Sequence, residues 1–158
     1  MRSWIMRQLK QLASGGLAMA VKALLGPTVL GASAMIFDRD GKVLLARHSY
    51  MSGWSLPGGG IKRGEPALRG LLRELREEIG VVRSDPPQFV GIFTRRTGWA
   101  TNVVVMYRLM NAEVEFRSNF EVREIVFADP ANPPAGTSAG TLRRLSEHTG
   151  QTPPAPFW

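Results

Sequence analysis

Cysteine is absent from this 158-residue sequence, and histidine occurs only twice. A chain without cysteine forms no disulfide bonds, and this composition fits a reducing compartment, so we expect a cytoplasmic protein. Zinc is disfavoured as a bound metal because His48 and His148 are far apart and stand at no zinc-ligand spacing. The apolar stretch 17–25 is too short to span a bilayer, and Lys22 divides it.

Acidic residues are also scarce relative to basic ones. Thirteen Asp and Glu face 20 Lys and Arg, which gives a formal net charge of +7. Because arginine binds phosphate through paired hydrogen bonds, the excess is compatible with a polyphosphate substrate or an anionic surface, although it requires neither. No aromatic-basic RNA signature or helix-turn-helix pattern accompanies it, so nucleic acid is not expected as the main partner. With 44% hydrophobic residues, the chain can bury one sizeable core.

The most informative segment is 59–81, where carboxylates at fixed spacing follow a glycine run. Apolar residues recur there at three- and four-residue steps from Glu65 onward, which predicts an amphipathic helix. They are Leu68, Leu71, Leu72, Leu75 and Ile79. Glu74, Glu77 and Glu78 fall on another face at i, i+3 and i+4. Like charges at this spacing repel each other, so a bound cation explains them better than an ordinary solvated face does.

Oxygen atoms are the donors that this segment offers to a metal. Glycines at positions 58–60 leave the backbone free to approach a ligand, and carboxylates with a backbone carbonyl form a hard site. Such a site suits Mg²⁺ or Mn²⁺, ions that keep several waters and bridge to substrate phosphates. Gly80 stands where a left-handed helix C-cap is expected.

The segment from Gly59 to Val81 resembles the Nudix box, the signature of the Nudix hydrolases, at every defined position. The resemblance implies an α/β protein with the Nudix fold, a mixed β-sheet in an α/β/α sandwich; composition alone leaves α/β or α+β open. It further implies a pyrophosphohydrolase with Mg²⁺ (or Mn²⁺) as cofactor. The implied substrate is a nucleoside diphosphate linked to another moiety, a nucleotide or a similar diphosphate compound, cleaved by water attack on phosphorus.

Residue roles are implied by the same resemblance. Arg73 and Glu65 would orient the loop and the helix. The metal ligands would be one backbone carbonyl and three glutamates: Gly58, Glu74, Glu77 and Glu78. The general base varies in this family between a box glutamate, such as Glu74, and a carboxylate in a later loop, and the sequence leaves the choice open.

Two later glutamates are candidates for that loop carboxylate. Glu121 and Glu124 precede the apolar run 125–127, which is read as a strand ending at the turn of Asp129 and Pro130. They are similar to the acidic positions before the last core strand of Nudix domains, and Glu121 is preferred. The alternative, two solvated charges at the start of a strand, stays open.

Candidate substrate contacts lie at the end of the second expected strand and in a later hairpin. An aromatic ring beside an arginine can stack a base and clamp phosphate. The candidates are Arg47, Tyr50, Arg95 and Trp99. The alternative is that both places are surface turns, since nothing in the sequence directs these side chains toward the metal.

The chain divides into three expected parts: an amphipathic helical extension at 1–27, the Nudix domain at 28–150 and a proline-rich tail at 151–158. The domain should contain strands 28–37 and 42–47, paired as a hairpin through the turn 38–41; strands 88–95 and 101–109; and a helix at 141–148. The aromatic residues of the tail either dock on the domain or stay mobile.

The N-terminal extension has three alternative roles. Basic residues opposite Trp4 and Leu9 could lay the helix on an anionic membrane surface, making the protein membrane-peripheral. Packing on the domain, or pairing two subunits into a homodimer, is at least as good an explanation. A signal peptide cleaved after Ala34 is disfavoured because cleavage would remove half of the first strand.

Two classes of function therefore remain, a metal-dependent hydrolase and a catalytically inactive Nudix-fold module that binds nucleotides or regulates a partner. An inactive module would be free to lose Glu74, Glu77 or Glu78. All three are present, so the enzyme is favoured.

Overall fold

The structure, a computed structural model, describes residues 27–158, and the expected helical extension therefore lies outside the described residues. The elements, in chain order, are β1 (Thr28–Ile36), β2 (Val43–His48), β3 (Gly58–Gly60), α2 (Ala67–Glu74), the π-helical segment η1 (Leu75–Ile79), β4 (Val81–Arg83), β5 (Gln88–Thr97), β6 (Ala100–Leu109), β7 (Glu113–Val114), β8 (Val122–Ala128) and α3 (Ala139–His148).

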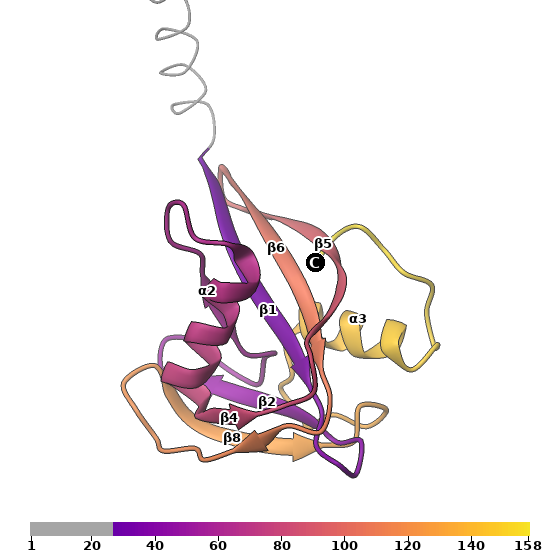
Figure 1. The fold of residues 1–158 in the computed structure, drawn as a ribbon. Helices are drawn as coiled ribbons and strands as arrows, with labels where there is room; N and C mark the ends of the chain where they lie inside the picture. The colour runs from indigo at the N-terminus through magenta and orange to yellow at the C-terminus, as the bar shows by residue number, and fades with distance from the viewer. Residues whose placement is uncertain (1–26) are drawn as a thin grey trace, which may run out of the picture.

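A four-stranded mixed sheet forms the middle layer, with strand order β3-β1-β6-β5. Strand β1 runs parallel to β6 and antiparallel to β3, and β5 and β6 form the later hairpin that the sequence predicts. The α2–η1 segment and α3 lie on opposite sides of this sheet (Figure 1). Two short sheets, β2-β8 and β4-β7, complete the domain. The expected α/β/α arrangement is therefore present.

The expected hairpin between the first two strands is wrong. A turn does follow Asp38, whose carbonyl accepts a hydrogen bond from the Gly41 amide at 3.2 Å. Beyond it, only an isolated bridge between Phe37 and Val43 joins the two segments, and β2 pairs with β8 in a separate sheet. Turn residues determine that the chain reverses, whereas burial of β2 on both faces determines its partner.

The core has two parts, one on each side of the strands, because successive side chains of a strand point to opposite faces. Ile36 of β1 belongs to the cluster under α2–η1, together with the predicted helix residues Leu71 and Ile79. Its neighbour Phe37 belongs to the cluster under α3, together with Leu145. Both helices are thus held on the sheet by apolar burial.

The predicted box helix is present but ends in a wider turn. Helix α2 covers Ala67–Glu74, and η1 continues it in π geometry to Ile79. Gly80 closes it in the left-handed conformation that the sequence predicts, with φ 75°, and its amide donates to the Leu75 carbonyl five residues earlier.

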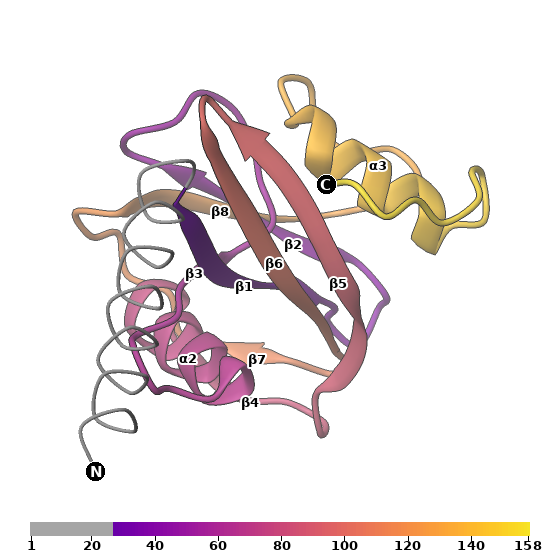
Figure 2. The same cartoon turned by 90° about the horizontal axis from the view of Figure 1, so that it is seen from above.

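The proline-rich tail docks on the domain. Phe157 forms a parallel bridge with Thr94 of β5, and the Trp158 ring packs edge-on against Phe93 at a centroid distance of 6.1 Å. Figure 2 shows the chain returning past α3 toward β5 at its end. Of the two expectations for the tail aromatics, docking is the one that the structure shows.

Candidate functional site

Three glutamates from three elements converge at the end of the box helix. Glu74 ends α2, Glu78 lies in η1, and Glu121 lies in the loop before β8. One carboxylate oxygen from each lies within 4.8 Å of the others, and the Glu78 side chain is buried. Three hard oxygen donors at this spacing fit Mg²⁺ or Mn²⁺.

Glu77, the third predicted box ligand, lies at the rim of this cluster. Its side chain is 60% exposed and its carboxylate accepts a weak contact from Arg73 at 3.5 Å. The wide π turn accounts for the separation, because its larger number of residues per turn places Glu77 further round the helix from Glu74 than an α-helix would. Even so, Glu77 lines the same cleft as the three clustered carboxylates.

The cluster is electrostatically strained without a cation. Burial, and then the neighbouring carboxylates Glu121 and Glu74, raise the pKa of Glu78 to about 9. In addition, the Glu78 Oε2 atom is buried and has no hydrogen-bond partner. A divalent cation would satisfy this oxygen and offset the repulsion among the three carboxylates, so the residues fit the metal that the sequence predicts.

Arg73 ties the helix to the glycine loop. Its Nε and Nη2 atoms donate to the two carboxylate oxygens of Glu65, each at 3.0 Å. Nη1 donates to Glu74 at 2.6 Å and Nη2 to the Gly60 carbonyl at 3.3 Å. The two bonds from Arg73 to Glu65, with one from the Lys62 amide, lower the pKa of Glu65 to about 2. Glu65 therefore stays ionised, and the contacts of this pair link the box helix to the loop that precedes it.

Asn119, which sequence reasoning missed, brings Glu121 to the box helix. Its Nδ2 donates to the Glu78 carbonyl at 2.8 Å, and its Oδ1 accepts from the amides of Glu121 at 3.0 Å and Val122 at 2.8 Å. The Ser49 amide holds the same loop by donating to the Glu121 carbonyl. Asparagine is a known turn former, and its place three residues before the strand was the available signal.

Glu124 has a different environment. It lies inside β8 rather than before it, and its carboxylate pairs with Arg47 of β2 at 3.0 Å. The Arg47 guanidinium also lies 4.3 Å from the centre of the Trp54 ring. The structure thus separates Glu124 from the carboxylate cluster and commits Arg47, a predicted substrate contact, to packing between β2 and its neighbours.

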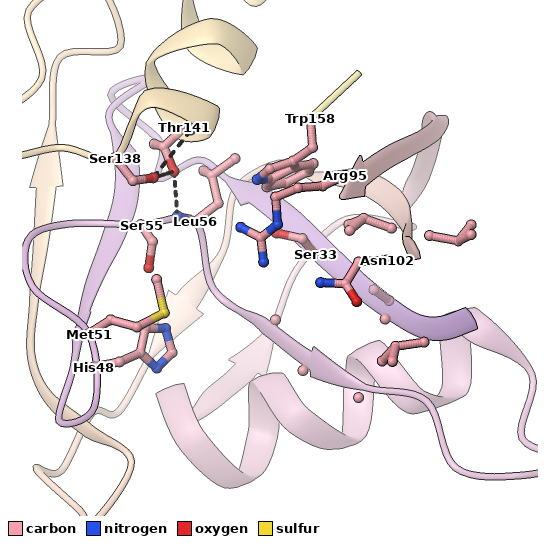
Figure 3. A pocket seen from close by; sticks show the side chains of 18 of the residues that line it. Ser33, His48, Met51, Ser55, Leu56, Arg95, Asn102, Ser138, Thr141 and Trp158 are labelled. Carbon is pink, nitrogen blue, oxygen red and sulfur yellow. Dashed lines mark hydrogen bonds between the residues drawn. The ribbon is translucent and has the colours of Figure 1, made fainter. Parts of the chain in front are cut away.

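A cavity of about 260 Å³ lies beside the glycine run. Two of the predicted substrate residues, Tyr50 and Arg95, line it, whereas Trp99 is 76% exposed at the turn between β5 and β6. Figure 3 shows polar side chains around this space. Those labelled there are Ser33, His48, Ser55, Arg95, Asn102, Ser138 and Thr141.

The cavity and the carboxylates are separated by one strand of backbone. Gly58 pairs with Ser33 of β1, and Gly59 lines the cavity. A Cβ atom at Gly59 would lie 2.6 Å from the Glu74 carboxylate carbon, so a side chain there would displace the Glu74 carboxylate from its present position. The same carboxylates act on Tyr50: burial, and then the charges of Glu78, Glu121 and Glu74, raise the pKa of its hydroxyl. A ligand in the cavity would therefore lie next to the cluster.

The fold is an α/β/α sandwich in which a glycine loop and a helix place carboxylates beside a cavity. The chain belongs to the Nudix family, since the model of the NUDIX domain matches residues 27–147. Among the described residues, no helix is long and apolar enough to cross a membrane.

Solved structures share this fold. The MutT NUDIX hydrolase from Burkholderia pseudomallei has a TM-score of 0.66 at 21% identity, over 75% of this chain and 96% of that one. A MutT protein from Methanosarcina mazei Go1 has a TM-score of 0.65 at 21% identity, over 78% and 96%. At these sequence identities, the structural similarity establishes the fold alone.

Curated relatives match a shorter region. An RNA pyrophosphohydrolase from Hahella chejuensis is 35% identical over 85 residues, which are 54% of this chain and 47% of the relative. Another, from Gluconobacter oxydans, is 41% identical over 66 residues, 40% of this chain and 35% of the relative. The matched region thus spans less than half the length of either relative.

Proposed function

We propose that this protein is a divalent-metal-dependent pyrophosphohydrolase that cleaves a nucleoside diphosphate linked to another moiety. The observation that carries the proposal is the convergence of Glu74, Glu78 and Glu121 beside the glycine-lined cavity. These glutamates would hold Mg²⁺, or Mn²⁺, with Glu77 and the Gly58 carbonyl as further candidates. When bound, such a cation neutralises phosphate charge and makes water a better nucleophile.

The contacts support the remaining roles in this proposal. Arg73 holds Glu74 in place through its 2.6 Å hydrogen bond and is itself fixed by Glu65. Glu121 is our candidate to accept the proton of the attacking water, because it alone of the clustered glutamates comes from a loop outside the box helix. Arg95 would contact the substrate from the cavity wall.

RNA carrying a 5′ triphosphate is a second candidate substrate. The relatives from H. chejuensis and G. oxydans are both RNA pyrophosphohydrolases, and a triphosphorylated RNA end contains the same anhydride bonds as a free nucleotide. This candidate departs from the sequence-based expectation, which placed nucleic acid low because of the missing RNA-binding signature.

The test is a substrate panel assayed with Mg²⁺, with Mn²⁺ and with a chelator. It should hold nucleoside triphosphates, nucleotide sugars, dinucleoside polyphosphates and a short 5′-triphosphorylated RNA, with released phosphate, pyrophosphate and monophosphate measured by chromatography. We expect metal-dependent release from at least one member. A folded protein that binds nucleotides and hydrolyses no member in either metal would instead support the inactive module.

A matched pair of variants tests the site itself. Glu121→Gln should lower kcat by about a hundredfold with little change in KM, because it removes a charge from the cluster. Glu124→Gln should behave like the parent, since Glu124, three residues after Glu121 in the sequence, pairs with Arg47 and not with the cluster. If both variants kept the kcat of the parent, Glu121 would be excluded from the reaction.

A further inference from the structure

The docked tail carries an aromatic side chain into the candidate substrate cavity. Trp158 lines this cavity although it lies outside residues 27–147, which match the family. Figure 3 shows its ring with Arg95 at one end of the cavity, while His48 and Met51 lie at the other. His48 lies near the carboxylate cluster, since the amide of its neighbour Ser49 donates to the Glu121 carbonyl at 2.8 Å.

The backbone of the tail is held by contacts independent of the indole. Thr94 of β5 donates its amide to the Pro156 carbonyl at 3.2 Å and accepts from the Trp158 amide at 2.9 Å. Arg144 donates to the Phe157 carbonyl at 3.0 Å. Together with a hydrogen bond from the Arg143 side chain to the Trp158 carbonyl, these bonds fix the position from which the ring projects.

The ring itself fits a space left for it. Phe93 packs against it edge-to-face, with an interplanar angle of 69°. A Cβ atom at Gly140 of α3 would lie 2.5 Å from the indole Nε1 and 2.6 Å from Cδ1, so a side chain there would displace the ring. The indole remains only partly buried and borders the cavity. The indole is thus a fixed aromatic surface, and the part of it that borders the cavity is accessible to a ligand.

We propose that Trp158 is a specificity-determining residue, on whose indole the nucleobase of the substrate stacks while Arg95 borders the same end of the cavity. The proposal rests on the function proposed above and names the part of the substrate that the tail recognises. Phosphates next to Glu74 would lie at the glycine run, and the base at the Trp158 end. Every nucleobase has a planar face, so stacking on the Trp158 indole selects a substrate that carries a base over a bare polyphosphate.

Binding of uncleavable ligands tests this proposal in the full chain. The probes are methylene-bridged analogues of ATP and UTP, and methylenebisphosphonate, which has neither base nor ribose. Titration calorimetry with Mg²⁺ should show Trp158→Ala weakening both nucleotide analogues about tenfold and changing the bisphosphonate by less than about twofold. Trp158→Phe should recover most of the affinity because it keeps an aromatic face.

Phe157→Ala is the matched control in the same tail. Phe157 is 65% exposed and its contacts to Thr94 and Arg144 use its backbone, so its affinities should equal those of the parent. Thermal unfolding of each variant identifies any loss caused by undocking of the tail. Equal weakening of all probes in Trp158→Ala, no weakening of any, or a parent that binds neither nucleotide analogue would overturn the proposal.

The outcome is separable from that of the proposed function because turnover is not measured. If the parent binds the analogues through Trp158 but hydrolyses no member of the substrate panel, the hydrolase proposal is refuted and the stacking role of Trp158 is retained. If the parent is active but Trp158→Ala does not selectively lose affinity for the nucleotide analogues, only the stacking role of Trp158 is refuted.

Discussion

Glu78 makes a single-residue case for metal dependence. Its carboxyl is 8% exposed, lies among two other carboxylates and leaves one oxygen without a partner. In water such a group has an ordinary pKa of 4.5, and in the folded protein its pKa is about 9. Folding therefore favours the protonated form, whereas the proposed function requires the ionised form to bind a cation.

This conflict predicts how stability depends on pH. Between its ordinary pKa of 4.5 and its folded pKa of about 9, Glu78 binds a proton more firmly in the folded state than in the unfolded state. The free energy of unfolding of the metal-free protein should then fall as pH rises through this window. Thermal unfolding across the window should show the fall in the parent and a flatter profile in Glu78→Gln.

Added Mg²⁺ should oppose the fall, because it replaces the proton at the carboxylates, and its stabilising effect should be larger at the alkaline end of the window. Glu124→Gln is the control, since that carboxylate pairs with Arg47 and lies outside the cluster. A parent whose stability ignores both pH and Mg²⁺ in this window would contradict the metal assignment.

Two neighbouring elements, η1 and the loop before β8, create the cluster together. The π turn brings Glu78 under Glu74, and the loop presents Glu121 from the other side. Asn119 is the link, since one side chain bonds the Glu78 carbonyl and the backbone of the loop. The geometry of the site thus depends on a residue that supplies no carboxylate.

Asn119→Ala should consequently weaken metal binding about tenfold or more, as expected when a group that supports a ligand is removed. It should also destabilise the fold by about 1–3 kcal/mol, because the Glu78 carbonyl and two amides lose their partner. Metal affinity can be measured by calorimetry and stability by urea unfolding.

Asn119→Asp supplies the comparison. It keeps the oxygen that accepts from the Glu121 and Val122 amides and loses the donor to Glu78. We expect an intermediate metal affinity if both halves of the link matter. Unchanged metal affinity in Asn119→Ala would show that the loop holds Glu121 without it, through contacts such as the Ser49 amide.

At the scale of the whole molecule, the described domain contains every candidate ligand of the site. Within the described residues 27–158, the cluster and the cavity are formed by residues that follow Thr28, and the family match starts at 27. The N-terminal segment lies outside the described residues, so its expected roles stay predictions: contact with an anionic membrane, packing on the domain or pairing of two subunits.

Deleting residues 1–26 should leave metal binding and turnover within about twofold of the full chain and abolish the association that the segment provides. Vesicle co-sedimentation at low and high salt, beside sizing of both proteins, separates a membrane role from a dimer. A truncated protein that folds and binds metal but has lost turnover would show that the segment helps to form the active site.

Local features were open to prediction from the sequence alone. Several features depend on residues that are close in the chain, so local sequence patterns predict them. They are the helical periodicity, the left-handed cap at Gly80, the later hairpin and the spacing that joins Arg73 to Glu65. The glycine run and the glutamates behind it likewise identified the family before any tertiary contact was considered.

Only the tertiary structure decided which of these groups meet. Glu121 joins Glu78 through the pairing of β8 with β2 and through Asn119, 41 residues from its hydrogen-bond partner. Glu77 leaves the cluster because the helix widens where it packs, and Trp158 reaches the cavity because its tail pairs with β5. Such contacts depend on burial and pairing between distant segments, and local propensity carries no record of the partner.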